Sequence, residues 1–201
     1  MPKLSATRTA ARRRQILDAA VVCFAERGFH KSTLQDVVRV SGLSPGSIYS
    51  HFDSKEDIIH AVIEGRHRDD LRNVELAANT DSLEEGLLLL ANALFPTQPR
   101  KEDRAWRRLA VQLWAESHHD AKLLRAVRDG VDKPLTVLAD LLHRAQKRGE
   151  LSPRLEPKST ARVLIAAFQG VALQQTWDER VDARVCFRAM QQLLRLAKTH
   201  D

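Results

Sequence analysis

Apolar residues recur along this chain at intervals of three and four positions, which is the repeat of one face of an α-helix. The clearest case lies between about Glu102 and Ser117, where these residues follow the repeat without interruption: Trp106, Leu109, Ala110, Leu113 and Trp114. Alternation with a period of two is never sustained, and β-branched residues are scattered along the chain. The pattern therefore predicts an all-α fold.

Helix start and stop signals are concentrated between residues 28 and 57. A first helix from about Thr7 to Arg27 is stopped by Gly28, a residue suited to the left-handed position after a helix. Further caps follow at short intervals: Thr33 and Ser54, each with an aspartate three residues later, then Gly42, and Ser44 with Pro45 behind it. These signals predict two short helices and the start of a longer one.

Beyond residue 80 the pattern predicts longer helices. They are expected at Ser82–Phe95, at about 102–117, over 120–148, from Pro157 onwards and from Asp182 to about Lys198. Gly130 and Pro134 lie inside the third of these segments, so we expect a kink or a break there.

Positive charge is concentrated at the start of the chain. The net charge of the 201 residues is +6. Residues 1–55 contain nine Lys/Arg and four Asp/Glu, so they account for five of the six excess charges. A basic first quarter followed by a balanced remainder is expected of a protein that meets phosphate with one end.

Two short helices joined by the tight turn Ser41–Leu43 form a helix-turn-helix pattern. Six apolar side chains are placed to form a small core between them: Leu34, Val37, Val38, Leu43, Ile48 and Phe52. The second helix begins with four small residues, which allow a helix end to enter the major groove of DNA closely: Ser44, Pro45, Gly46 and Ser47. Tyr49 and His51 can reach phosphates or a thymine methyl, and Lys55 is a further phosphate partner. A well-capped αα-hairpin without a DNA-binding role is the alternative interpretation.

Four segments carry a more specific signal: FAERGF at 24–29, STLQDVV at 32–38, SGLSPGSIYSHF at 41–52 and SKEDI at 54–58. In content and spacing they resemble the N-terminal domain of the TetR family of bacterial transcriptional regulators. The resemblance implies an all-α homodimer with a three-helix DNA-binding head. It also implies a larger helical domain that binds a small molecule and shifts the heads out of register with the operator.

The same resemblance implies roles for individual residues. Thr33, Tyr49, His51 and Lys55 would contact phosphate, while Pro45, Gly46 and Ser47 would face the bases. Many members of the family have Lys where this chain has Pro45, which removes one long side chain from the interface. We therefore expect indirect readout and the basic residues Arg8 and Arg12–Arg14 to contribute more.

The predicted domains are residues 1–53, the DNA-binding helix-turn-helix domain, and residues 54–201, a ligand-binding and dimerisation domain. The run Ala161–Phe168 is apolar on all sides of a helix, so it must be covered on both sides. We expect a second subunit to cover one side, through Leu164, Ile165, Phe168, Val171, Val185, Ala189 and Leu193. Burial of both faces within one subunit is the alternative.

Trp106 and Trp114 share one helical stripe, which is typical either of an apolar ligand site or of ordinary core. The ligand-site hypothesis includes Trp106, Leu109, Gln112, Leu113, Trp114 and Phe168. Arg104, Arg107 and Arg108 are interpreted mainly as a solvated face, with an acidic ligand as the alternative. We expect neither a metal site nor a cofactor, because His118 and His119 have no further ligand at a suitable spacing.

The remaining features favour a cytoplasmic, nucleoid-associated bacterial protein without a membrane partner. There is no run of about 18 apolar residues and no secretory signal core. Cys23 and Cys186 are interpreted as free thiols. The favoured function is a homodimeric repressor that an unidentified small-molecule effector releases from a palindromic, double-stranded DNA operator. A ligand-independent or activating regulator is the alternative, and an enzyme is not expected because phosphate-loop, nucleophile and metal motifs are missing. Operator sequence, effector and regulated genes are not encoded in any motif.

Overall fold

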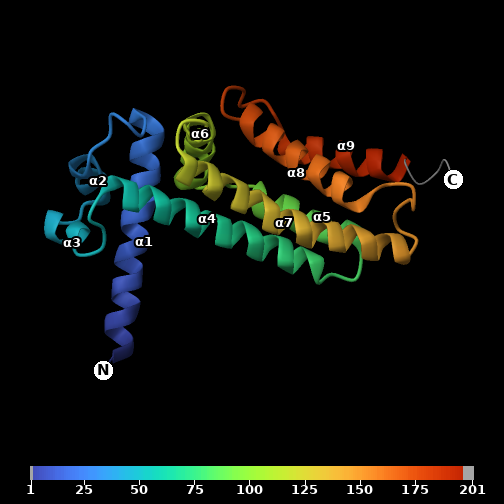
Figure 1. The fold of residues 1–201 in the computed structure, drawn as a ribbon, viewed down its shortest axis with the longest axis horizontal. Coiled ribbons are helices and arrows are strands. Elements are labelled where there is room, and N and C mark those ends of the chain that lie inside the picture. The colour runs from blue at the N-terminus through green and yellow to red at the C-terminus, as the bar shows by residue number, and fades with distance from the viewer. Residues whose placement is uncertain (1, 197–201) are drawn as a thin grey trace. The chain divides into compact units, whose positions relative to one another are not determined.

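A computed structural model describes residues 2–196, with side chains over residues 7–195. Within this range the chain is helical and contains no strand. The helices are α1 (Pro2–Arg27), α2 (Leu34–Ser41), α3 (Pro45–Tyr49), α4 (Lys55–Ala78), α5 (Leu83–Leu94), α6 (Lys101–Glu116), α7 (Ala121–Lys147), α8 (Pro157–Gln174) and α9 (Ala183–Leu196) (Figure 1). The prediction of an all-α fold is confirmed.

The predicted capping residues lie at the starts and ends of the first helices, at or near the expected positions. The side-chain oxygen of Thr33 accepts a hydrogen bond from the backbone N–H of Asp36 at 3.2 Å. Ser44 caps α3 in the same way through the N–H of Ser47 at 3.3 Å. Gly28 and Gly42 have φ values of 82° and 67°, which residues with a Cβ rarely adopt. Polar caps and left-handed glycines thus set the boundaries of the first three helices.

Of the kink or break expected in α7, the break is absent, because the helix is continuous from Ala121 to Lys147 with Pro134 inside it. The kink stays a prediction. Pro134 has no N–H to donate to the carbonyl of Gly130, four residues earlier. The side chain of His67 lies against Gly130: a Cβ added at Gly130 would meet the His67 ring at 2.2 Å. The glycine therefore allows α4 to approach α7 at the turn that proline weakens.

The chain divides into two compact units. Unit 1 consists of the described residues of Met1–Arg66 together with Pro99–Leu123, and unit 2 of those of His67–Gln98 and Leu124–Asp201. These units are defined by their internal contacts, so the expected functional domains 1–53 and 54–201 stay a prediction. Helix α6, although distant in sequence, packs against α1 and joins unit 1.

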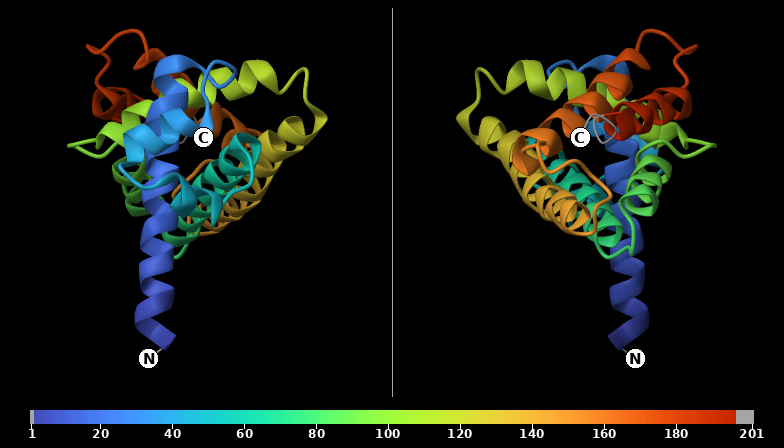
Figure 2. Two further views of the ribbon diagram at one scale, coloured as in Figure 1. Left: turned by 90° about the vertical axis from the view of Figure 1, so that its left-hand side faces the viewer. Right: turned by 90° about the vertical axis from the view of Figure 1, so that its right-hand side faces the viewer.

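Unit 1 has a core of α1, α2, α3, the first half of α4, and α6. Its most deeply buried side chains include Ile16 and Phe24 of α1, Ile48 of α3, Ile58 of α4 and Leu109 of α6, each 0% exposed. The first turns of α1 extend beyond α2 and α3 in both views of Figure 2. Basic residues that the sequence analysis assigned to DNA binding lie on this helix, where Arg8, Arg12 and Arg14 are exposed.

Unit 2 is built around leucines of α5 and α7, together with side chains of α4, α8 and α9. Leu141 and Leu142 of α7 are 0% exposed, and Leu87 of α5 is 2% exposed. The N-terminus of α5 is tied to the loop after α7, since Leu83 N–H donates to the Glu150 carboxylate at 2.6 Å. Among the described residues, no helix is long and apolar enough to cross a membrane.

Candidate nucleic-acid interface

Helices α2 and α3 form the predicted helix-turn-helix, and a small apolar core holds them. Val37, Ile48 and Phe52 are buried, whereas Leu34, Val38 and Leu43, which were also expected there, are only half-buried. The turn is closed by the Gly42 N–H, which donates to the carbonyl of Val38 at 3.0 Å. It is joined to α1 by the side-chain amide of Gln15, which donates to the carbonyl of Ser41 at 2.8 Å.

The N-terminal end of α3 presents the small residues that the sequence analysis expected. Ser44, Pro45 and Gly46 are exposed, and a Cβ added at Gly46 would meet nothing within 4 Å. Ser47 is half-buried. Because these side chains are short, the backbone at the end of the helix is accessible to a large, flat partner such as the edge of a base pair.

Tyr49 and His51 lie at the other end of α3. Tyr49 is 55% exposed, so its ring and hydroxyl are available to a partner. His51 is half-buried, and its ring centroid lies 6.5 Å from that of Phe52. The guanidinium of Arg13 lies 5.2 Å from the centroid of the same Phe52 ring, which brings positive charge from α1 to this end of α3.

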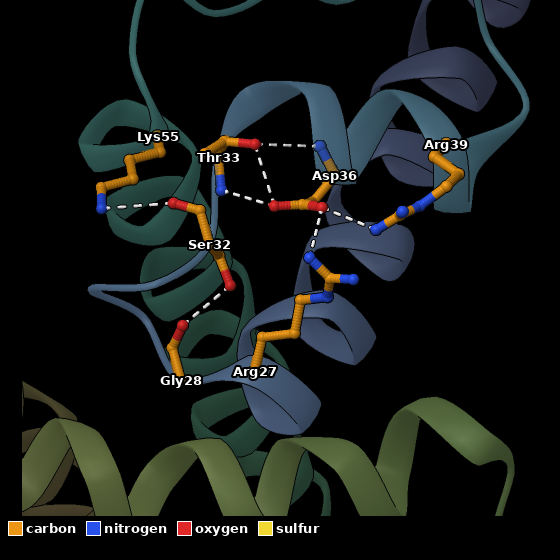
Figure 3. Close-up of polar contacts among 7 residues, drawn as sticks. All are labelled: Arg27, Gly28, Ser32, Thr33, Asp36, Arg39 and Lys55. Atoms are coloured by element: carbon orange, nitrogen blue, oxygen red, sulfur yellow. Dashed lines mark hydrogen bonds and ion pairs between the residues drawn. The ribbon is translucent and has the colours of Figure 1, made fainter.

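A single carboxylate, that of Asp36, organises the start of α2 (Figure 3). Its Oδ1 accepts from Arg27 Nη1 at 2.7 Å and from Arg39 Nη2 at 2.6 Å. Its Oδ2 accepts from the backbone N–H of Thr33 at 3.0 Å and from the Thr33 hydroxyl at 2.9 Å. The hydrogen bonds from Thr33, and then the charges of Arg27 and Arg39, hold the pKa of Asp36 below its ordinary value of 3.8.

The Asp36 cluster was only partly foreseen. The spacing of Thr33 and Asp36 predicted the capping pattern, and Arg39, three residues after Asp36, was readable as a same-face ion pair. Nothing in the sequence pointed to Arg27, which reaches Asp36 from the end of a different helix. Both donors of Thr33 are directed to Asp36, so Thr33 holds the start of α2 rather than offering a free donor to a phosphate.

Lys55 is likewise engaged within unit 1. Its ammonium donates to the carbonyls of Phe29 at 3.2 Å, His30 at 3.3 Å and Ser32 at 3.4 Å, the last of which is drawn in Figure 3. It also lies 4.7 Å from the centroid of the Phe29 ring. An ammonium has three N–H donors, and these contacts account for all three. Lys55 therefore ties the start of α4 to the loop before α2.

The residues expected to bind a ligand do not form one group. Leu109 and Leu113 are buried in the core of unit 1, and the Gln112 amide lies 3.5 Å from the carbonyl of Ala25 on α1. Trp106 and Trp114 are half-buried on the same helix. Phe168 belongs to unit 2, where its ring is stacked between those of Phe95 and Phe187 at centroid distances of 6.2 and 6.3 Å.

The residues expected at a subunit interface differ in exposure. Leu164 is 2% exposed and belongs to the core of unit 2. The others range from half-buried to largely exposed: Ile165, Phe168 and Val171 are half-buried, while Val185, Ala189 and Leu193 are exposed. Other exposed apolar side chains of unit 2 were not assigned to the interface, among them Val163 and Trp177, each 66% exposed. Val163 lies in the apolar run that was expected to be covered on both sides, but no sequence signal singled out Trp177.

Neither cysteine forms a disulfide, and the described residues contain no group of three or more His, Cys, Asp or Glu side chains placed to hold a metal ion. Burial raises the pKa of the Cys23 thiol above its ordinary value.

Comparison with known proteins shows which protein family this chain resembles. Residues 16–62 match the family model of bacterial regulatory proteins of the tetR family, and residues 77–193 match that of the tetracyclin repressor-like C-terminal domain. The HTH-type transcriptional regulator UidR of Escherichia coli (strain K12) is 28% identical over 169 residues, which are 79% of each chain. The HTH-type transcriptional repressor Rv1474c of Mycobacterium tuberculosis (strain ATCC 25618 / H37Rv) is 40% identical over 83 residues, 41% of this chain and 42% of the relative.

The fold is also shared with solved structures. Salmonella enterica GusR superposes with a TM-score of 0.70 at 26% identity, covering 92% of this chain and 96% of that one. The relatives are named as transcriptional regulators rather than enzymes. The chain belongs to the TetR family of bacterial transcriptional regulators, with a DNA-binding helix-turn-helix in α2 and α3.

Proposed function

We propose that this regulator is a homodimeric repressor that a small-molecule effector releases from a palindromic operator. The observation that carries the proposal is the accessible start of α3, where Ser44, Pro45 and Gly46 are exposed on a helix-turn-helix held by the Asp36 cluster. A helix end without bulky side chains can enter a major groove.

The proposed roles at the DNA interface are of three kinds: contacts to bases, contacts to phosphates, and positioning of the helices. Ser44, Pro45, Gly46 and Ser47 face the base edges, while Tyr49 and His51 contact phosphates. Thr33 and Lys55 act as positioning residues, because their donors are directed to Asp36 and to the carbonyls of residues 29–32. The basic residues of α1 supply further phosphate contacts, which carry affinity without specifying sequence.

Dimerisation is proposed through α8 and α9, which lie side by side in unit 2 (Figure 1). Val163, Val185 and Leu193 expose apolar surface on these two helices. Surfaces of this kind are typical of a partner contact. Two-fold symmetry would place two heads on half-sites about 34 Å apart, or a multiple of that distance, so the operator would be a palindrome.

Release requires an effector that binds better to the state that does not fit the operator. The two compact units are linked by continuous helices, since α4 and α7 each contribute residues to both. A change of conformation in one unit can therefore be transmitted along a helix axis to the other.

The test is a selection of genomic fragments with the full-length chain, followed by footprinting of the enriched sequence at two salt concentrations. We expect a two-fold symmetric footprint whose affinity falls as salt rises. Tyr49→Ala is expected to weaken operator binding by about tenfold or more, equivalent to about 1.4 kcal/mol. Leu76→Ala, on an exposed position of α4 in unit 2, is the control. Enrichment of no sequence would contradict the proposal.

A further inference from the structure

Helix α1 extends past the apolar core of unit 1 at its N-terminal end. Ile16 is 0% exposed, whereas the side chains of residues 7–15 are exposed, apart from the half-buried Arg13. This segment of residues 7–15 is hereafter the extension, and the first turns of α1 lie beyond α2 and α3 in both views of Figure 2. Arg8 precedes Ile16 by eight residues, which is about 12 Å along a helix axis. The extension is therefore a helical arm outside the core.

The face of α1 that carries Ile16 changes from apolar to cationic in the extension. Ile16 and Ala20, about one turn apart, are both completely buried. The positions that continue this face towards the N-terminus lie three, four, seven and eight residues before Ile16. They are occupied by Arg13, Arg12, Thr9 and Arg8. The face that packs on protein further along α1 is thus continued by three arginines and a threonine.

Charge is unevenly distributed around the extension. Ala10, Ala11 and Arg14 lie on the side of the helix opposite to Ile16, and Arg14 pairs there with Asp18, Nε to Oδ2 at 3.9 Å. Residues 2–17 include no Asp or Glu, so this segment of α1 contains no carboxylate to offset the arginines on the Ile16 face.

Arg8 and Arg12 are four residues apart, the spacing at which like charges on a helix repel each other. Both side chains are exposed, so solvent and other molecules can reach them. An anion bound along this face would offset the repulsion. The composition of the face therefore favours a partner with closely spaced negative charges.

Two contacts anchor α1 to the helix-turn-helix at the point where the extension begins. The side-chain amide of Gln15 donates to the carbonyl of Ser41, the last residue of α2, at 2.8 Å. The guanidinium of Arg13 lies 5.2 Å from the centroid of the Phe52 ring, just after α3. The arm is therefore held relative to the two helices that meet DNA, and its cationic face adjoins the surface that α3 presents to the duplex.

We propose that the extension is a phosphate clamp, in which Arg8 and Arg12 bind the backbone of duplex DNA beside the groove that α3 enters. Unlike a general attraction by the basic residues of α1, the clamp uses one face of the helix and one stretch of DNA. About 12 Å of helix corresponds to about four base pairs, at 3.4 Å for each step of the duplex. Arg13 is a positioning residue through its contact with Phe52. The clamp lengthens the bound site and adds affinity without sequence preference.

The first test measures the affinity of the full-length protein for a duplex of random sequence at several salt concentrations. Each phosphate contact contributes about 0.9 to the slope of log affinity against log salt concentration, so Arg12→Gln should lower the slope by about one for each bound subunit. Arg14→Gln removes the same charge from the opposite side and should lower the slope less. Arg108→Gln, at an exposed position of α6, should leave it unchanged. Thermal unfolding of the variants checks that they are folded.

The second test compares hydroxyl-radical footprints of the wild type and Arg8→Gln/Arg12→Gln on the selected operator. The double variant should keep the protection of each half-site and lose that of about four base pairs beside it. Changing the base sequence of those base pairs should leave the affinity of the wild type unchanged, because the clamp contacts phosphates. Equal slopes for the wild type and Arg12→Gln, or equal losses from Arg12→Gln and Arg14→Gln, would overturn the clamp.

The clamp rests on the proposed function for its place beside an operator, but the two fail in different ways. A symmetric footprint that is identical for the wild type and the double variant would overturn the clamp and leave the repressor proposal standing. Enrichment of no sequence would contradict the repressor proposal. The random duplex would still test the clamp in that case, since contacts to phosphates do not require an operator.

Discussion

Units 1 and 2 fix their structures by different means. In unit 1 the segment from Arg27 to Ile58 has short helices and a small core, and its geometry depends on side-chain hydrogen bonds around Asp36 and Lys55. In unit 2 long helices enclose a leucine-rich core, with Leu141 and Leu142 completely buried. A surface that reads DNA must stay polar and accessible, so side-chain hydrogen bonds supplement the buried apolar core in this segment.

The outer surfaces of units 1 and 2 also differ in how many large apolar side chains they expose. The large apolar side chains that unit 1 exposes among the described residues are Val40 and Tyr49. Those of unit 2 are Leu76, Leu88, Leu89, Val163, Trp177, Val185 and Leu193. The apolar surface of unit 2 is expected to contact a partner protein, whereas the surface of unit 1 is expected to contact phosphate.

The largest effect is expected from a cavity in the core of unit 2. Leu142→Ala removes a side chain that is 0% exposed, and substitutions of this kind cost about 2–5 kcal/mol of unfolding free energy. Chemical denaturation of the two proteins measures the difference. Leu76→Ala is the control, because Leu76 is 55% exposed and its truncation should change the unfolding free energy by less than about 0.5 kcal/mol. Equal effects of the two substitutions would break the distinction drawn between core and surface.

Much of this contrast could be predicted from the sequence. The helices, their caps and the helix-turn-helix follow from local signals, such as Thr33 with Asp36 and Gly42 after α2. What could not be predicted depends on residues brought together from distant segments. Arg27 on Asp36 and α6 on α1 are both of this kind, because periodicity reports which face of a helix is apolar but not which helix covers it.

Residue roles were harder to predict than residue positions. Thr33 was assigned to phosphate through the family resemblance, and Lys55 through both the resemblance and its place at a helix start. Their hydrogen-bond partners are intramolecular, and a sequence cannot show that a donor is already used. For α7 a kink or a break was expected, and the break is absent. The contact between Gly130 and His67 joins two segments that are distant in sequence, so periodicity could not reveal it.

A smaller effect is expected from a methyl group at that contact. Gly130→Ala places a Cβ at 2.2 Å from the His67 ring, so the two helices or the imidazole must move. Overpacking of this kind costs about 1–3 kcal/mol, more than the helix propensity gained from alanine. Gly170→Ala on α8 is the matched control, because its added Cβ meets nothing within 4 Å. That variant should be neutral or slightly more stable in thermal unfolding, and a stabilising Gly130→Ala would contradict the described packing of α4 on α7.

The smallest effect at neutral pH, and the one that separates the two units most directly, is expected from Asp36→Asn. The amide keeps the shape of the carboxylate but loses its charge towards Arg27 and Arg39, whose side chains are 50% and 62% exposed, so solvent screens much of the interaction. Because the pKa of Asp36 is below its ordinary 3.8 in the folded state, its ionised form stabilises the fold above that pH.

That contribution should be complete above about pH 5, should decrease as the pH falls through 3.8, and should vanish below the lowered pKa of the folded protein. Denaturation curves of the wild type and Asp36→Asn between neutral and acidic pH therefore should converge on the acid side. A gap that stays constant with pH would mean that Asp36 acts through its shape, as a capping side chain, and that unit 1 depends less on charge than its contacts indicate. Convergence would show that the start of α2 is held by an ionised carboxylate. The geometry of the DNA-reading end of the molecule would then be sensitive to acid in a way that the leucine core of unit 2 is not.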